Sequence, residues 1–144
     1  MDTSSTFAVS ASALRAQQLR MEVIAANLAN AQSTRTPEGG PYRRRDVVLR
    51  SVSQGDSFDD MLAPSGLPTT GVEVARVLQD SKPPQMVYDP GHPDANSAGY
   101  VAMPNVNVVT EMIDMMAATR AYEANVQAMN ATKRVIEAAL EIGK

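Results

Sequence analysis

The fold is decided by residues 108–140, VVTEMIDMMAATRAYEANVQAMNATKRVIEAAL, in which apolar side chains recur at alternating spacings of four and three residues. This spacing is typical of a heptad stripe along one side of an α-helix. The stripe consists of Val108, Met112, Met115, Thr119, Tyr122, Val126, Met129, Lys133, Ile136 and Leu140, with Thr119 and Lys133 as its imperfect positions. Residues 107–142 contain neither proline nor glycine, so the pattern predicts one uninterrupted helix of ~50 Å.

The amino-terminal flank carries a second heptad stripe. Phe7, Leu14, Met21 and Leu28 recur every seven residues, and residues 4–31 also lack proline and glycine. They predict a helix of ~40 Å that can pair with the carboxy-terminal one. We therefore expect a mainly α fold, in which long N- and C-terminal helices pair as a coiled coil around a small β-rich or irregular middle segment.

The middle of the chain is typical of short strands and turns. Eight of the nine prolines and seven of the eight glycines fall between residues 35 and 99. Strand-like runs occupy 45–52, 71–74 and 85–88, and the apolar alternation slips phase before Val77, which predicts a bulge or a bend. The expected organisation is an N-terminal helix in 1–34, a β-rich and loop segment in 35–106 with a flexible loop at 53–70, and a C-terminal helix in 107–144.

The first predicted helix has few charges. Residues 1–31 contain Asp2, Arg15, Arg20 and Glu22 as their only charged side chains. A helix that faces water on one side usually carries dense charge on that side. We infer that this helix is surrounded by other helices in its working state. The alternative is an Ala-rich amphipathic helix in a monomeric hairpin.

The composition excludes several classes of function. The 144 residues carry a formal net charge of −3, which argues against binding nucleic acid through broad phosphate neutralisation. With no cysteine and one histidine, thiol catalysis, cysteine-based zinc sites and catalytic triads lack their residues. We expect that the protein is not an enzyme and that it binds neither a cofactor nor a metal. The apolar runs fall well short of the ~20 residues of a membrane span, and the first residues lack the pattern of a cleaved signal peptide.

Two polar clusters remain. Residues 89–94, DPGHPD, have the composition of a tight turn, and the competing hypothesis is an acid/base or metal site at His92. Arg43, Arg44 and Arg45 form a basic cluster. One interpretation is that the cluster contacts an outside anion, either carboxylates of a neighbour or an anionic polymer. The other is that it forms a solvated strand edge.

Several blocks of sequence resemble the flagellar rod, hook and hook-associated family of axial proteins. Residues 25–31 (AANLANA) and 40–44 (GPYRR) resemble the N-terminal signature of the rod proteins, and residues 120–125 (RAYEAN) resemble the C-terminal signature of the wider family. Residues 88–95 (YDPGHPDA) and 99–107 (GYVAMPNVN) resemble the proximal-rod members. The resemblance covers nearly the whole chain.

This resemblance implies a structural subunit of the proximal rod of the bacterial flagellar basal body. In the family, the terminal helices pair as a coiled coil in the inner layer of a helical tube that transmits torque from the membrane ring to the hook. The implied location is the periplasmic rod, reached through the flagellar type III export apparatus without a cleaved signal peptide. The implied partners are copies of the chain, the other rod proteins, the membrane-ring protein and the rod-base adaptor. A small soluble helical-hairpin regulator or export chaperone is the alternative.

The candidate site is therefore an assembly interface. Its apolar members are expected to hold the two helices of the subunit together, and Asn27, Asn30 and Asn125 are candidate polar locks of their register. Asn107 is the preferred N-cap of the second helix. The expected interface residues are Leu14, Met21, Asn27, Leu28, Asn30, Met112, Met115, Tyr122, Asn125, Val126 and Met129, with Arg43, Arg44 and Arg45 as candidate polar contacts.

Overall fold

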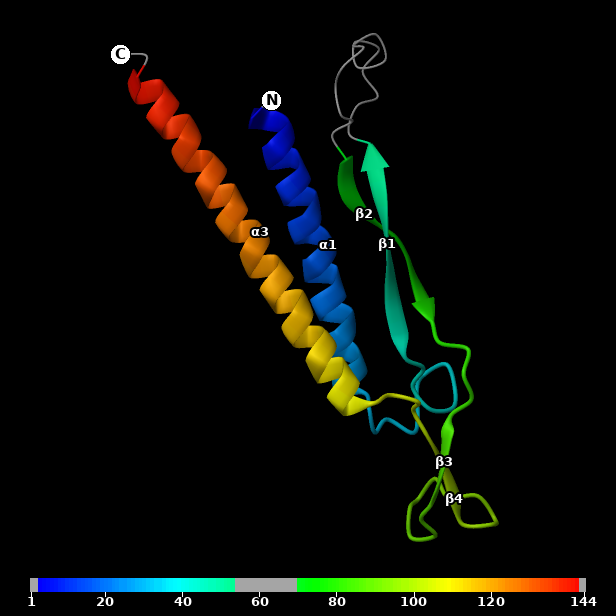
Figure 1. The fold of residues 1–144 in the computed structure, drawn as a ribbon. Helices are drawn as coiled ribbons and strands as arrows, with labels where there is room; N and C mark the ends of the chain where they lie inside the picture. Colours follow the sequence, from blue (N-terminus) through cyan, green and yellow to red (C-terminus); the bar gives the residue numbers. More distant parts are fainter. Residues whose placement is uncertain (1–2, 54–69, 143–144) are drawn as a thin grey trace.

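The computed structural model describes residues 3–53 and 70–142, which form two long helices and two small antiparallel sheets (Figure 1). Helix α1 spans Thr3–Ala29 and helix α3 spans Val108–Ile142, close to the predicted ranges. Between them lie strands β1 (Arg45–Ser53), β2 (Thr70–Gln79), β3 (Gln85–Tyr88) and β4 (Tyr100–Met103). The loop expected at 53–70 lies outside the described residues, except that Ser53 ends β1 and Thr70 begins β2. The mainly α architecture with a small β middle segment is confirmed.

Helix α1 is the middle layer of the molecule. It runs antiparallel to α3 on one side, and the β1–β2 hairpin packs against it on another (Figure 1). The Oγ atom of Ser12 accepts the Val72 N–H of β2 at 3.0 Å, and the Thr119 hydroxyl of α3 lies 3.6 Å from the Met21 sulfur. Within the chain, one neighbour of this weakly charged helix is therefore a strand pair, where the sequence led us to expect helices.

Helix α3 begins at a side-chain cap. The Oδ1 atom of Asn107 accepts the backbone N–H groups of Val109 at 3.0 Å and Thr110 at 3.2 Å, and the Asn107 carbonyl accepts that of Glu111 at 3.0 Å. These contacts satisfy donors that the first helical turn otherwise leaves without partners. The predicted N-cap is confirmed.

The β1–β2 hairpin contains the predicted irregularity. Val48 is paired with Arg76, but the next residue, Leu49, is paired with Val74, so one residue of β2 has no opposite partner. Such a bulge bends and twists the strand pair, as the phase slip before Val77 indicated. The prediction of a bulge is confirmed.

The second hairpin, β3–β4, extends from the end of the molecule at which α1 ends and α3 begins (Figure 1). Strand β4 was not predicted. The connection between the two strands contains Gly99 at φ +79°, where an added Cβ would lie 2.8 Å from the Tyr88 ring. The rings of Tyr88 and Tyr100 meet edge to face at 5.2 Å between centroids. Glycine is therefore required at position 99.

The apolar core is thin. Among the residues that the structure describes, the buried apolar side chains are Ala16, Ile24, Tyr42, Val101 and Ala118. In the same part of the chain, no helix combines the length and the apolarity that crossing a membrane requires. Because most of the described apolar residues stay partly exposed, the subunit by itself gains little free energy from burial.

Candidate assembly surfaces

A polar junction joins the end of α1 to the start of β1 and the first turn of α3. Its centre is Asn27, whose side chain is fully buried. The Nδ2 atom donates to the Arg45 carbonyl at 2.8 Å and to Glu111 Oε2 at 2.9 Å. The Oδ1 atom accepts the Tyr42 hydroxyl at 3.0 Å and the Arg45 N–H at 2.9 Å. Both donors and both acceptor positions of the amide are thus occupied, and this network fixes its orientation.

A buried ion pair lies beside this asparagine. Glu111 is 1% exposed, and its Oε1 accepts the Nε–H of Arg44 at 2.7 Å. The Arg44 guanidinium also lies 3.4 Å from Asp46 and 4.0 Å from Asp114. Burial alone would lower the pKa of Arg44, but the hydrogen bond to Glu111 and its charge raise that pKa above its ordinary value. Removing Arg44 would leave the buried Glu111 carboxylate without its counter-charge, whereas the partly exposed Arg44 would keep Asp46 and Asp114 as acidic neighbours.

Tyr42 forms the outer wall of the junction. Burial raises the pKa of its phenol above 10.0, the Arg45 guanidinium opposes that rise, and the Glu111 carboxylate adds to it. The Arg45 guanidinium carbon lies 5.9 Å from the centre of the Tyr42 ring. The neutral phenol is therefore the species that donates to Asn27 across the physiological pH range.

The three arginines of the basic cluster divide between two sides of the chain. Arg44 turns inward to Glu111, whereas the exposed Arg43 and Arg45 line a surface pocket. Successive side chains of an extended segment point to opposite sides, which explains this division. Glu111 and Tyr42 were not among the predicted site residues. No local signal in the sequence indicates them, because both belong to a network that joins segments far apart in the chain.

Of the three candidate polar locks, Asn27 alone bonds across elements. The Nδ2 of Asn30, directly after α1, donates to the Ala26 carbonyl in the last turn of that helix at 2.9 Å. The Nδ2 of Asn125 donates to the Ala121 carbonyl at 2.8 Å, within its own helix. The short side chains of Asn30 and Asn125 are thus satisfied by the preceding turn. Within the part of the chain that the structure describes, they do not join the two helices.

The two heptad stripes are only partly covered within the subunit. Met112 is 54% exposed, on the open side of α3. The buried helical positions are instead Ser10, Ala16, Ile24, Asn27, Glu111 and Ala118. Small side chains such as alanine and serine let neighbouring backbones approach closely. The predicted residues of intermediate exposure are Leu14, Met21, Leu28, Met115, Tyr122, Val126 and Met129.

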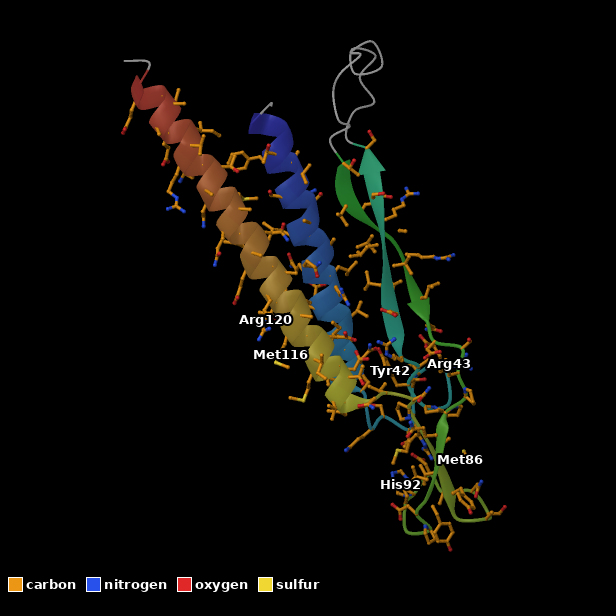
Figure 2. The ribbon with its side chains drawn as sticks, viewed as in Figure 1. Tyr42, Arg43, Met86, His92, Met116 and Arg120 are labelled. Carbon is orange, nitrogen blue, oxygen red and sulfur yellow. The ribbon has the colours of Figure 1, made fainter. Side chains whose placement is uncertain are left out.

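The first turns of α3 present an exposed apolar surface, here called the α3 apolar face. Its side chains recur at intervals of one and three residues, which places them on one side of the helix. Figure 2 shows Met116 on the side of α3 that points away from α1, with the polar Arg120 one turn later. The members, each between 44% and 66% exposed, are Val108, Val109, Met112, Ile113 and Met116. Large contiguous apolar surfaces are typical of sites that contact another molecule.

The turn at residues 89–95 is attached to the segment after α1. The His92 Nδ1 accepts the Asp94 N–H at 3.1 Å, and Asp94 accepts the Thr34 hydroxyl at 2.7 Å and pairs with Arg35. The hydrogen bond from Thr34, with the charge of Arg35, holds the pKa of Asp94 below its ordinary value. In the described part of the chain, no three His, Cys, Asp or Glu side chains cluster in a way that could hold a metal ion. The contacts of His92 are those of a turn (Figure 2).

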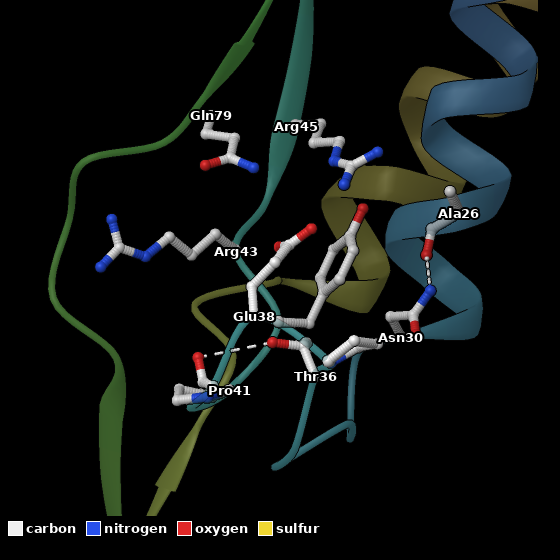
Figure 3. A pocket seen from close by; sticks show the side chains of 11 residues that line it. Ala26, Asn30, Thr36, Glu38, Pro41, Arg43, Arg45 and Gln79 are labelled. Atoms are coloured by element: carbon white, nitrogen blue, oxygen red, sulfur yellow. Dashed lines mark hydrogen bonds between the residues drawn. The ribbon is translucent and has the colours of Figure 1, made fainter.

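A pocket of ≈ 430 Å³ lies beside Tyr42, here called the arginine pocket (Figure 3). Arg43 and Arg45 approach it from the start of the β1 segment, and Glu38 from the preceding loop. Positive backbone angles at Gly39 (φ 89°) and Gly40 (φ 76°) shape that loop. The lining residues are Ala26, Asn30, Thr36, Pro37, Glu38, Gly39, Pro41, Tyr42, Arg43, Arg45 and Gln79.

Comparisons with known proteins identify the family of the chain. Residues 7–35 match the family model described as flagella basal body rod protein, and residues 97–142 match the one described as flagellar basal body rod FlgEFG protein C-terminal. The chain is 49% identical to the flagellar basal-body rod protein FlgC of Bacillus subtilis (strain 168), with 94% of this chain and 95% of that protein covered.

Two further relatives carry the same name. The identity is 43% to FlgC of Escherichia coli O6:H1, with 96% of each chain covered. It is 35% to FlgC of Aquifex aeolicus, with 100% of this chain and 99% of that protein covered. The relatives are structural proteins, which agrees with the expectation that the chain is no enzyme. At these identities over nearly the full length, the chain belongs to the FlgC family of flagellar basal-body rod proteins.

Proposed function

We propose that this rod subunit is built into the basal body through its α3 apolar face and its two half-exposed heptad stripes, which contact helices of neighbouring rod subunits. The observation that carries the proposal is the exposure of the five apolar side chains of the α3 apolar face. Burying one such side chain fully contributes ~1.5–3 kcal/mol, so covering the exposed half of five contributes ~4–7 kcal/mol. A gain of that size is comparable to the whole stability of many small domains.

The thin core supports the same proposal. With few apolar side chains buried among the described residues, ordering two long helices costs conformational entropy that the subunit alone can hardly offset. Contacts with neighbours supply the missing burial. The heptad pattern supports helical neighbours that pack as in a coiled coil, because that packing requires the same spacing.

Membership of the family supports a proposal about the wider assembly. We propose a place in the proximal rod, in the periplasmic part of the flagellar basal body, within a helical tube that transmits torque from the membrane ring to the hook. Copies of the chain and the other rod proteins would then be neighbours, the membrane-ring protein and the rod-base adaptor would lie at the base, and the flagellar type III export apparatus would deliver the chain. Head-to-tail contacts that do not close on themselves generate such filaments.

The test is a charge placed in the α3 apolar face. Ile113→Asp should remove the chain from isolated basal bodies and stop motility, because a buried carboxylate without a partner costs several kcal/mol. Gln127→Asp, on an exposed polar position of the same helix, is the matched control and should assemble. Normal assembly of the Ile113→Asp chain would refute the proposal. A helical-hairpin regulator or export chaperone would be absent from basal bodies in both variants and in the unmodified chain.

A further inference from the structure

We propose that the arginine pocket binds carboxylates of an acidic segment of a neighbouring rod protein. This inference deepens the proposed function and rests on it. The exposed Arg43 and Arg45 line the pocket (Figure 3). Within residues 3–53 and 70–142, neither guanidinium has an ion-pair partner, whereas those of Arg35, Arg44 and Arg50 pair with acids of the same chain. The two cations at the pocket are thus available to an outside anion.

The pocket is held in shape by the polar junction. Arg45 lies over the Tyr42 ring, and the hydroxyl of that tyrosine donates to the buried Asn27 at 3.0 Å. The opposite wall is a closed loop in which the Gly39 N–H donates to the Thr36 carbonyl at 3.0 Å. The Thr36 N–H donates to the Gly40 carbonyl at 2.9 Å. A preformed pocket loses little conformational entropy when it is filled, which favours binding.

The chemistry favours carboxylates. Each guanidinium presents donors in a planar fork that matches the two oxygens of a carboxylate. Glu38 lines the same pocket without pairing with either arginine, so the lining keeps an excess of one positive charge over the acid. A volume of ≈ 430 Å³ is of the size that small polar groups with their adjoining chain occupy.

The distribution of charge favours a peptide over an anionic polymer. A polymer is bound along an extended track of cations. Here only two unpaired arginines line the pocket, and the net charge of the chain is −3. The other described cations without an ion-pair partner, which are Arg15, Arg76, Lys82, Arg120 and Arg134, lie outside the pocket lining. An acidic peptide segment, which brings one or two carboxylates to one place, fits this arrangement.

The pocket also depends on the fold of its own subunit. Asn27 of α1 holds both Tyr42 and the backbone of Arg45, and it is itself held by Glu111 of α3. The backbone of Arg45 and the Tyr42 ring beneath its guanidinium are therefore fixed when both helices have joined at the junction. A neighbour that binds the pocket therefore selects a subunit that has already folded at this end.

The experiment uses photo-crosslinking in assembled basal bodies. In one strain a photo-reactive residue replaces Gln79, which lines the pocket. In a second strain, the control, it replaces Leu78, whose side chain points to the other face of β2 because successive residues of a strand alternate. We expect the Gln79 position to crosslink to a rod protein at a peptide that contains aspartate or glutamate. The Arg43→Glu exchange should lower that yield by at least about tenfold, equivalent to ~1.4 kcal/mol. Arg76→Glu, the same charge change on β2 outside the pocket lining, should change the yield by less than about twofold.

Several outcomes would overturn the inference. The first is that basal bodies contain the chain but the Gln79 position gives no crosslink. The second is a crosslink to a segment without acidic residues or to a non-protein polymer. The third is a crosslink yield that Arg43→Glu leaves unchanged. If the Arg43→Glu chain is absent from basal bodies, Arg43→Gln serves for the same comparison, with a loss of several-fold expected. Absence of the unmodified chain from basal bodies contradicts the proposed function instead.

Discussion

Replacing Asn27 with alanine removes the centre of the polar junction. The change takes partners from the Tyr42 hydroxyl, from the N–H and the carbonyl of Arg45, and from one oxygen of Glu111. Three of these hydrogen bonds join neutral groups and contribute ~0.5–1.5 kcal/mol each, and the bond to the carboxylate contributes ~1.5–3 kcal/mol. The sum is ~3–7 kcal/mol. We expect the lower end, ~3–4 kcal/mol, because water can enter the space that alanine leaves.

Amide hydrogen exchange of α3 in isolated basal bodies measures this loss. Residues 115–122 are the reporters, because none of their amides bonds to Asn27. Since ~1.4 kcal/mol corresponds to a factor of ten, their exchange should become faster by about two to three orders of magnitude in the Asn27→Ala chain.

The matched control is Asn30→Ala, three residues further along the chain and directly after the last residue of α1. The Asn30 side chain donates to the Ala26 carbonyl and accepts the Ser33 hydroxyl, so its loss is local. We expect a change of about tenfold or less. Equal effects of the two variants would refute the assignment of Asn27 as the residue that couples the helices.

Three further predictions concern the packing of the subunit. Gly99→Ala should destabilise the β3–β4 hairpin by ~1–2 kcal/mol or more, because φ is +79° and the added Cβ would lie 2.8 Å from a tyrosine ring. In Gly91→Ala the added Cβ has its nearest atom at 3.6 Å, so this variant should keep the NMR signals of the folded hairpin nearly unchanged. Ala118→Leu should overpack the contact between the helices and cost ~1–3 kcal/mol, seen as a lower midpoint of thermal unfolding, and the exposed Ala117→Leu should not. The lowered pKa of Asp94 means that its contacts stabilise the turn at every pH above the ordinary value of 3.8 and are lost as the pH falls through the folded-state pKa. The NMR signal of the Asp94 side-chain carboxyl carbon should therefore change with a midpoint below 3.8, and Thr34→Val, which removes the hydroxyl donor, should raise that midpoint.

Local patterns predicted the elements well. The absence of proline and glycine, together with the heptad spacing, predicted both helices to within a few residues. The phase slip before Val77 predicted the bulge, and Asn107 predicted the start of α3. These features depend on neighbouring residues in the sequence, so the sequence contains their cause.

Contacts between distant segments were harder to predict. The heptad stripes identified the apolar sides of the helices, but the positions buried within the subunit are small or polar ones such as Ala118 and Asn27. A heptad stripe that contacts neighbouring subunits has the same spacing as one that pairs within the chain, so the spacing does not distinguish the two. The pairing of Arg44 with Glu111 joins residues far apart in the sequence, and composition alone does not indicate it. Strand β4 was missed although it is as long as the predicted strand β3, because what defines it is its pairing with β3, a segment further back in the chain.

The central claim, that the subunit is completed by its neighbours, is tested most directly by amide hydrogen exchange of α1 and α3 in the purified chain and in isolated basal bodies. The account predicts that both helices exchange at least about a hundredfold faster in the free chain, a difference of ~2.8 kcal/mol. Equal protection of the two helices in the free and the assembled chain would contradict it.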